Sequence, residues 1–168
     1  LLAVNTGINE TTEYLLPDGS KVWLNQSSTI RYPETFTGET REIYLEGEAF
    51  FDIVQDANKP FIIHANNTQT KVVGTSFGIR AFKESDKVIV TVSTGIIKFS
   101  TEGKSDHIEL RQGEQGICNT EKQQLEKNAN PDPNYLAWKT KVLVFKQSSL
   151  SEVAKVVEDV YHTSVSVN

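Results

Sequence analysis

The sequence predicts a mainly β protein, either an antiparallel two-sheet sandwich or a solenoid-like β domain, followed by a small β-α-β module. Three observations predict it. Short runs rich in Val, Ile, Phe, Tyr and Thr recur between about residues 14 and 118, with turn-forming patches between them. No helix-period stretch interrupts these runs, which argues against a parallel βαβ sheet. After residue 134 the pattern changes to strand, amphipathic helix and strand.

The first strong local signal is the turn Pro17-Asp18-Gly19. Proline presets φ, aspartate hydrogen-bonds its own backbone, and glycine accepts a positive φ. The turn is flanked by the apolar runs 14–16 and 22–24. This arrangement predicts a tight hairpin that opens the β domain.

The later strands are expected at 41–45, 70–73, 87–92 and 107–110. Residues 87–92 alternate long enough to give one wet and one buried face. Three glycines lie just before or inside a new strand, where a glycine suits a tight corner between sheets: Gly47, Gly95 and Gly113.

The composition divides the chain into three parts. We expect an all-β domain over residues 1–119 and a polar linker, ending in two prolines, over 120–134. Residues 135–168 are expected to form a partial β-α-β module, with strands at 142–145 and 163–167. Between these strands, Ser149-Leu150-Ser151-Glu152 is a capping-box pattern that begins an amphipathic helix. Its apolar stripe consists of Leu150, Val153, Ala154, Val157, Val160 and Tyr161.

Composition and charge restrict the function classes. The 168 residues are 38% hydrophobic and 23% charged, as in a soluble globular protein, and carry a net charge of −5. The negative charge argues against a nucleic acid or an anionic membrane as the main partner. No apolar run is long enough to span a bilayer, and no signal-peptide pattern is visible. Because the chain lacks methionine altogether, we expect it to be a piece of a longer protein.

No motif in the sequence points to catalysis, a cofactor or a metal. The three histidines, His64, His107 and His162, are widely separated and not at metal-ligand spacing. The single cysteine, Cys118, excludes an internal disulfide and is expected to be a buried, inert thiol. The pair Glu46 and Glu48 suits a paired-carboxylate glycosidase, but flanking a glycine it is more typical of a turn edge. We therefore expect a protein that is not an enzyme.

Several sequence blocks together resemble the extracytoplasmic domain of FecR-type anti-sigma factors, in the form found in Bacteroidetes. In chain order, the blocks are residues 16–25, 27–33, 44–53, 59–64, 72–79, 95–99 and 110–115. The resemblance therefore covers roughly residues 14–115. The motif residues, for which it implies structural roles, are Pro17, Asp18, Gly19, Trp23, Asn25, Tyr32, Pro33, Gly47, Glu48, Gly74, Thr75, Phe77, Gly95, Gly113 and Glu114.

The C-terminal module is similar to the short N-terminal domain of secretins and TonB-dependent receptors. The resemblance as a whole implies the periplasmic sensor part of an inner-membrane protein that spans the membrane once. Such a protein relays a signal from the signalling domain of a TonB-dependent outer-membrane receptor to an extracytoplasmic-function sigma factor. A cytoplasmic segment, absent from this sequence, would bind the sigma factor.

The physical chemistry of edge strands suggests where a partner would bind. Strand addition is a general way for small modules to dock, so we expect contact at Val142, Val144, Val165 and Val167. We expect Tyr135 and Trp138 to orient the module. For the side chains that face inward, packing within the module itself is the competing interpretation.

A second function class remains open, namely a periplasmic carbohydrate-binding or adhesion β module. Exposed tryptophans are sugar-stacking platforms, and Trp23 and Trp138 are the candidates, although core packing is the more typical role. Coplanar exposed aromatic residues in a groove would favour a sugar, whereas a free strand edge would favour a protein. A purely structural envelope domain is a third interpretation.

Overall fold

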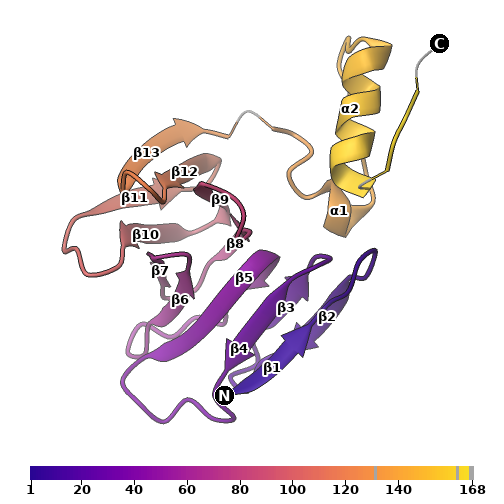
Figure 1. Cartoon of the computed structure of the whole chain (residues 1–168). Helices are drawn as coiled ribbons and strands as arrows, with labels where there is room; N and C mark the ends of the chain where they lie inside the picture. The colour runs from indigo at the N-terminus through magenta and orange to yellow at the C-terminus, as the bar shows by residue number, and fades with distance from the viewer. Residues whose placement is uncertain (131, 162, 167–168) are drawn as a thin grey trace. The chain divides into compact units, whose positions relative to one another are not determined.

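The computed structural model describes residues 1–130, 132–161 and 163–166 of a chain that divides into two compact units. Unit 1 is Leu1–Asn130 and unit 2 is Pro131–Asn168. Thirteen strands and two helices occur in the described residues, so the chain is mainly β, as predicted (Figure 1). Neither described helix is long and apolar enough to cross a membrane.

Unit 1 is built around one long strand, β5 (Arg41–Asp52). The first half of β5 pairs antiparallel with β4 (Thr29–Tyr32) and parallel with β6 (Phe61–Ala65). Its second half pairs antiparallel with β3 (Lys21–Leu24) and with β8 (Ser76–Ala81). Two sheets therefore share β5. We call the sheet that contains β4 sheet A and the sheet that contains β3 sheet B.

The other strands extend the two sheets outward from these central pairs (Figure 1). In sheet A they are β1 (Leu2–Asn5) beside β4, then β7 (Thr68–Val72), β10 (Ile96–Thr101) and β11 (His107–Arg111) beyond β6. In sheet B they are β2 (Thr12–Leu15) beside β3, then β9 (Lys87–Thr94), β12 (Glu114–Asn119) and β13 (Gln124–Ala129) beyond β8.

Gly47 makes the bend at which β5 passes from one sheet to the other. Its φ is +102°, a conformation that side chains with a Cβ rarely adopt. A Cβ built on Gly47 would lie 2.7 Å from the Cα of Ser28, which is far inside van der Waals contact. The expected use of glycine at a corner between sheets is therefore confirmed at this position.

The core of unit 1 is a single cluster of buried side chains contributed by both sheets. The rings of Phe51 and Phe77 stack in it with their centroids 5.3 Å apart. Val88, Val90 and Val92 are buried on β9, as the predicted alternation requires. The opposite face is not the wet face that was expected, because Thr91 is also buried and Ile89 is half-buried. Burial of this apolar surface is the main source of stability for unit 1.

The turn at residues 17–19 has the predicted form. The N–H of Leu16 donates to the carbonyl of Ser20 at 2.8 Å, and Gly19 has a φ of +85°. The carboxylate of Asp18 accepts from both the N–H and the hydroxyl of Ser20, at 3.1 and 2.7 Å. The hairpin β2–β3 is thus closed by the residue types that predicted it.

Residues 120–134, expected as a linker, contain strand β13. It pairs with β12 over six positions, from Gln124 opposite Asn119 to Ala129 opposite Glu114. Backbone hydrogen bonds to a sheet edge do not require apolar side chains, and Leu125 is the one hydrophobic residue of β13 that packs on the core. Because the segment is polar, its composition did not predict this strand.

Unit 2 contains α1 (Ala137–Thr140) and α2 (Leu150–Tyr161). The predicted capping box is present, because the N–H of Ser149 donates to Glu152 Oε2 at 2.7 Å and the N–H of Glu152 donates to Ser149 Oγ at 3.3 Å. The structure differs from the β-α-β expectation at the flanking segments, since residues 142–145 and 163–166 form no strand. A strand requires a hydrogen-bonded partner, and neither segment has a neighbouring strand among the described residues.

Candidate partner-binding surface

The described part of unit 2 leaves much of its apolar surface exposed. Its large exposed apolar side chains are Val142, Val144, Phe145, Leu150, Tyr161 and Val165. Val142 is 60% and Leu150 is 72% exposed. Isolated exposed apolar residues are ordinary on a protein surface, but six in so small a unit make it the candidate interaction surface of this chain. We call these six residues the apolar set.

Helix α2 contributes to this exposure because its apolar stripe is incompletely covered. Ala154 is the only stripe residue that is buried, whereas Val153, Val157 and Val160 are half-buried. Leu150 and Tyr161 stand at the two ends of the helix and are exposed. The sequence periodicity placed the stripe, but the predicted contact residues did not include Leu150, Tyr161 or Phe145, which are also exposed.

The segment around Val144 is held by a side chain instead of by a strand. The amide of Asn134 donates to the carbonyl of Val144 at 3.0 Å and accepts from its N–H at 2.7 Å. Asn134 itself is buried. The side chain of Asn134 thus makes with Val144 the two backbone hydrogen bonds that a neighbouring strand would make. The backbone groups of Leu143 and Phe145 make no hydrogen bond among the described residues.

The predicted contact residues have different environments in the structure. Val142, Val144 and Val165 are exposed, as a contact role requires. The N–H of Val165 donates to Glu158 Oε1 at 2.9 Å.

The two aromatic residues expected to orient the module are less accessible. Trp138 is only 7% exposed and lies in α1, and Tyr135 is half-buried. Val167, like His162, lies outside the described residues.

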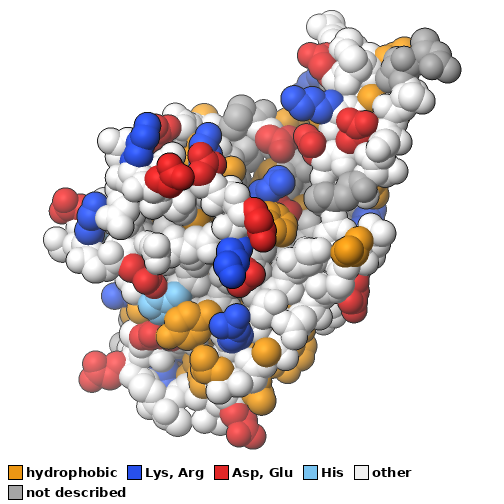
Figure 2. Space-filling model, viewed as in Figure 1, with side chains coloured by type: hydrophobic (Ala, Val, Ile, Leu, Met, Phe, Trp, Pro, Cys, Tyr) orange, Lys and Arg blue, Asp and Glu red, His pale blue; other side chains and the backbone are white. Residues whose placement is uncertain are grey.

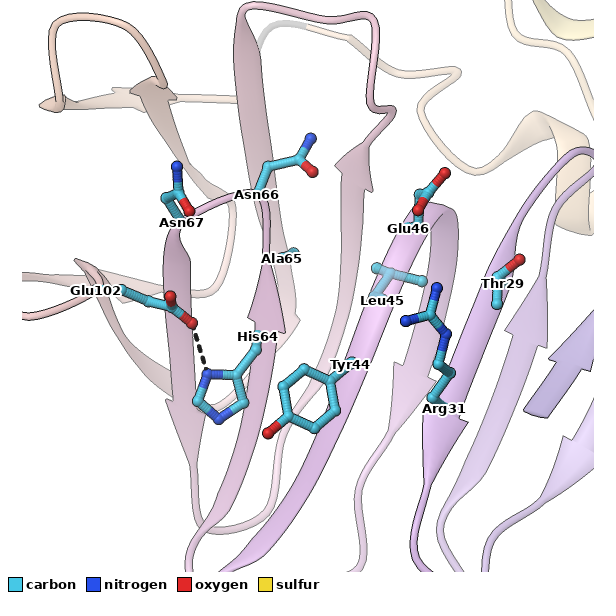
Figure 3. Close-up of a pocket in the computed structure, with 10 residues that line it drawn as sticks. All are labelled: Thr29, Arg31, Tyr44, Leu45, Glu46, His64, Ala65, Asn66, Asn67 and Glu102. Carbon is cyan, nitrogen blue, oxygen red and sulfur yellow. Dashed lines mark hydrogen bonds and ion pairs between the residues drawn. The ribbon is translucent and has the colours of Figure 1, made fainter. Parts of the chain in front are cut away.

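Unit 1 carries a polar hollow on the outer face of sheet A (Figure 3). Its volume is about 290 Å³. Arg31, Tyr44 and His64 form a row across β4, β5 and β6, since Tyr44 is in register with both of the others. The rings of Tyr44 and His64 stack with centroids 4.9 Å apart. Asn66, Asn67 and Glu46 border the hollow above this row.

The two ring nitrogens of His64 contact two carboxylates, one on β5 and one in the turn after β10. Nδ1 lies 2.8 Å from Glu102 Oε1, and Nε2 lies 3.3 Å from Glu42 Oε2. The hydroxyl of Thr40, followed by His64, lowers the pKa of Glu42 below its ordinary value. Its two nitrogens thus connect β6 to a carboxylate on β5 and to one in the turn after β10.

Two motif residues from distant blocks meet behind the bend in β5. The side-chain amide of Asn25 donates to Glu48 Oε2 at 2.8 Å. Glu48 is therefore held in place by a residue of another motif block. Trp23 is half-buried beside Phe50, and its indole N–H donates to Glu13 at 3.1 Å.

Motif residues also pack where β5 leads into the next loop and where β8 and β10 begin. A Cβ on Gly74 would lie 2.7 Å from the Cα of Gln55, and one on Gly95 would lie 3.0 Å from the hydroxyl oxygen of Thr75. The hydroxyl of Thr75 donates to the carbonyl of Ile96 at 3.2 Å. A side chain with a Cβ at Gly74 or Gly95 would therefore crowd these neighbours.

The remaining motif residues also lie in the scaffold of unit 1. Tyr32 and Phe77 are buried in the core, and Pro33 follows β4. Gly113 has a φ of +79° in the turn between β11 and β12. Glu114 accepts from the N–H of Arg111 at 2.7 Å.

The groups considered for catalysis or metal binding are dispersed. Cys118 is buried, and the desolvation of its thiol raises its pKa. Within residues 1–130, 132–161 and 163–166, no group of three or more His, Cys, Asp or Glu residues could hold a metal ion. Acidic and basic side chains alternate over the face seen in Figure 2.

Comparison with known proteins is consistent with this geometry. A family model described as FecR protein matches residues 3–98. Two crystal structures of a candidate anti-sigma factor from Parabacteroides distasonis are also similar, each with 31% sequence identity and a TM-score of 0.79. The similarity covers 96% of this chain in both cases, and 76% and 75% of the other chain. No match was found among curated proteins.

Proposed function

Because this chain belongs to the FecR family of anti-sigma factors, we propose that it is the periplasmic sensor part of a membrane-anchored anti-sigma factor. In this proposal the signalling domain of a TonB-dependent outer-membrane receptor binds the chain. The binding is transmitted through one transmembrane helix ahead of Leu1 to a cytoplasmic segment that holds an extracytoplasmic-function sigma factor. Release of that factor starts transcription of transport genes.

The observation that supports this proposal is the exposed apolar set of unit 2. Three residues of this set, Val142, Val144 and Phe145, belong to a segment in which the backbone groups of Leu143 and Phe145 make no hydrogen bond among the described residues. A strand from the receptor's signalling domain would pair with these groups and cover Val142 and Val144. Main-chain hydrogen bonds would supply affinity, and the exposed side chains would supply specificity.

The mechanism requires a binding equilibrium and no chemical reaction. A receptor can change the state of this chain only if it binds one conformation of it more tightly than another. In this proposal unit 1, whose buried side chains form a single cluster, is the scaffold, and unit 2 would supply the contact surface.

Titration calorimetry with the purified signalling domain of the receptor encoded beside this chain tests the proposal. We expect saturable one-to-one binding by the intact chain, and loss of binding in Val142→Asp and Val144→Asp. Val73→Asp is the matched control, because Val73 is an exposed valine of unit 1. A folded chain that does not bind, or equal binding by all three variants, would contradict the proposal.

The carbohydrate-binding alternative receives little support from the aromatic side chains. Trp138 is buried, and Trp23 is packed beside Phe50 and hydrogen-bonded to Glu13. Tyr44 is the one tyrosine or tryptophan in the hollow of sheet A, and its ring is stacked on His64. A sugar platform of several coplanar aromatic residues is not formed by these side chains.

A further inference from the structure

Four strands of unit 1 pair with a neighbour on one side only among the described residues, namely β1 and β11 in sheet A and β2 and β13 in sheet B (Figure 1). An edge strand presents a row of unpaired backbone groups, and proteins commonly protect such edges with charged side chains. β2, β11 and β13 contain Glu13, Glu109 and Glu126 respectively. β1 has the sequence Leu-Ala-Val-Asn and no charged side chain. Within the described residues, β1 is therefore the edge strand that lacks this protection.

The backbone of β1 directs the groups of every second residue toward the open edge. The N–H of Thr6 donates to the carbonyl of Ser28 at 2.9 Å, one position beyond the register of β1 with β4. In an antiparallel pair, successive residues alternately bond to the neighbouring strand and point away from it. Since Thr6 bonds toward β4, Val4 does so as well, whereas the N–H and C=O of Ala3 point away. Ala3 therefore has a donor and an acceptor for a further strand.

An apolar side chain is incompletely covered at the same edge. Val4 is half-buried and packs against the core cluster of unit 1. Leu2 lies two residues earlier and therefore on the same face of the strand, yet it is 47% exposed. The apolar layer between the sheets thus ends at β1 with a leucine that a further strand would cover.

We propose that the edge of β1 binds β1 of a second copy of this chain, antiparallel and about a twofold axis at Ala3. In this register Ala3 of each copy donates its N–H to the carbonyl of Ala3 in the other copy. Leu2 of each copy lies opposite Val4 of the other, so each copy covers the leucine that the other leaves exposed. Sheet A of one copy then continues into sheet A of the second.

Charge and symmetry favour a second copy as the occupant of this edge. Because β1 has no charged side chain, its pairing with itself brings no like charges together. Leu2 and Val4 also lie symmetrically about Ala3, so one register matches both. The same pairing at the centre of β11 would place Glu109 opposite Glu109, which is unfavourable. A twofold pairing occupies the β1 edge of both copies, so the assembly ends at a dimer.

This contact goes beyond the proposed receptor contact and does not depend on it. It uses residues of unit 1 only and none of the apolar set. The paired strands are short, so the dimer is expected to be weak in solution, with an interface smaller than that of a stable complex. Its detection therefore requires a high protein concentration.

Sedimentation equilibrium of the intact chain, at concentrations up to about 1 mM, tests the proposal. We expect a monomer–dimer equilibrium without larger species. We expect Ala3→Pro to weaken the dimer about tenfold or more, because proline removes the N–H that each copy donates and the dimer contains two such bonds. The monomer should stay folded, since proline is tolerated where the N–H of an edge strand points away from the sheet.

Ala129→Pro is the matched control, because Ala129 is an exposed alanine of the edge strand β13. The N–H of the next residue, Asn130, donates to the carbonyl of Gly113, so the N–H of Ala129 also points away from its sheet. This variant should dimerise as the unmodified chain does. Leu2→Lys places a charge at the β1 edge and should also weaken the dimer. Leu15→Lys is its control, because Leu15 is an exposed leucine on β2.

Urea unfolding of each variant shows whether its monomer is folded, and Leu2→Lys tests the pairing independently if Ala3→Pro does not fold. A chain that stays monomeric up to about 1 mM would overturn the proposal and point to a different protein as the occupant of the edge. Species larger than a dimer would also overturn it. So would equal dimerisation by Leu2→Lys and Leu15→Lys, or by folded Ala3→Pro and Ala129→Pro.

Discussion

Gly47 is the residue at which a single strand becomes part of two sheets, and its substitution should be severe. We expect Gly47→Ala to lower the free energy of unfolding by about 3 kcal/mol or more, because the new Cβ meets Ser28 and the backbone has a positive φ. Urea unfolding, with midpoint and slope both fitted, measures the change.

Gly103→Ala is the control for the backbone contribution alone. Gly103 also has a positive φ, +74°, but a Cβ there would have nothing within 4 Å. We expect this variant to lose only about 1 kcal/mol. Equal losses in the two variants would show that the close approach to Ser28 has no energetic importance.

The buried pair of Asp18 and Arg41 gives a second residue-scale prediction. We expect Asp18→Asn to lower the free energy of unfolding by about 3 kcal/mol, because it leaves the charge of Arg41 buried without its counter-ion. The exposed pair Glu109–Arg111 serves as the comparison. Glu109→Gln should cost less than about 1 kcal/mol, since solvent screens that pair. A small loss in Asp18→Asn would contradict the structural role of the pair.

These residue contacts mark a limit of prediction from sequence. The turn at Pro17-Asp18-Gly19 was predictable because its chemistry is local. Arg41, the partner of Asp18, is 23 residues away, and Glu48, the partner of Asn25, is likewise distant. Such pairs depend on the register of strands on either side of β5. No pattern within the separate segments encodes that register.

Among the elements, α2 has the most testable local signal. The N–H and the hydroxyl of Ser149 lower the pKa of Glu152, so the ionised carboxylate favours the folded helix end. This stabilisation is present above the unfolded pKa of Glu152 and is lost as pH falls through its lowered value. We expect Ser149→Ala to reduce helicity at neutral pH and to weaken its loss on acidification, as measured by circular dichroism. Ser148→Ala, outside the capping box, should behave as the unmodified chain.

The prediction of strands failed at two segments, where the side-chain composition and the backbone hydrogen bonding point to different structures. Residues 142–145 are apolar and alternate like a strand, yet the partner at Val144 is the side chain of Asn134. Residues 124–129 are polar, yet they form β13 because β12 offers an unpaired edge. The pattern of apolar and polar side chains indicates which face of a segment is buried. It does not report whether an edge is available to pair with it.

The molecule as a whole should behave as two separable units. All residues of the core cluster belong to unit 1, so we expect residues 1–130 alone to unfold cooperatively, with nearly the same urea midpoint as the intact chain. The same fragment should not bind the receptor's signalling domain, because it lacks the apolar set. If residues 1–130 fail to fold, or if they bind the signalling domain as tightly as the intact chain, then the division of roles between the two units is wrong.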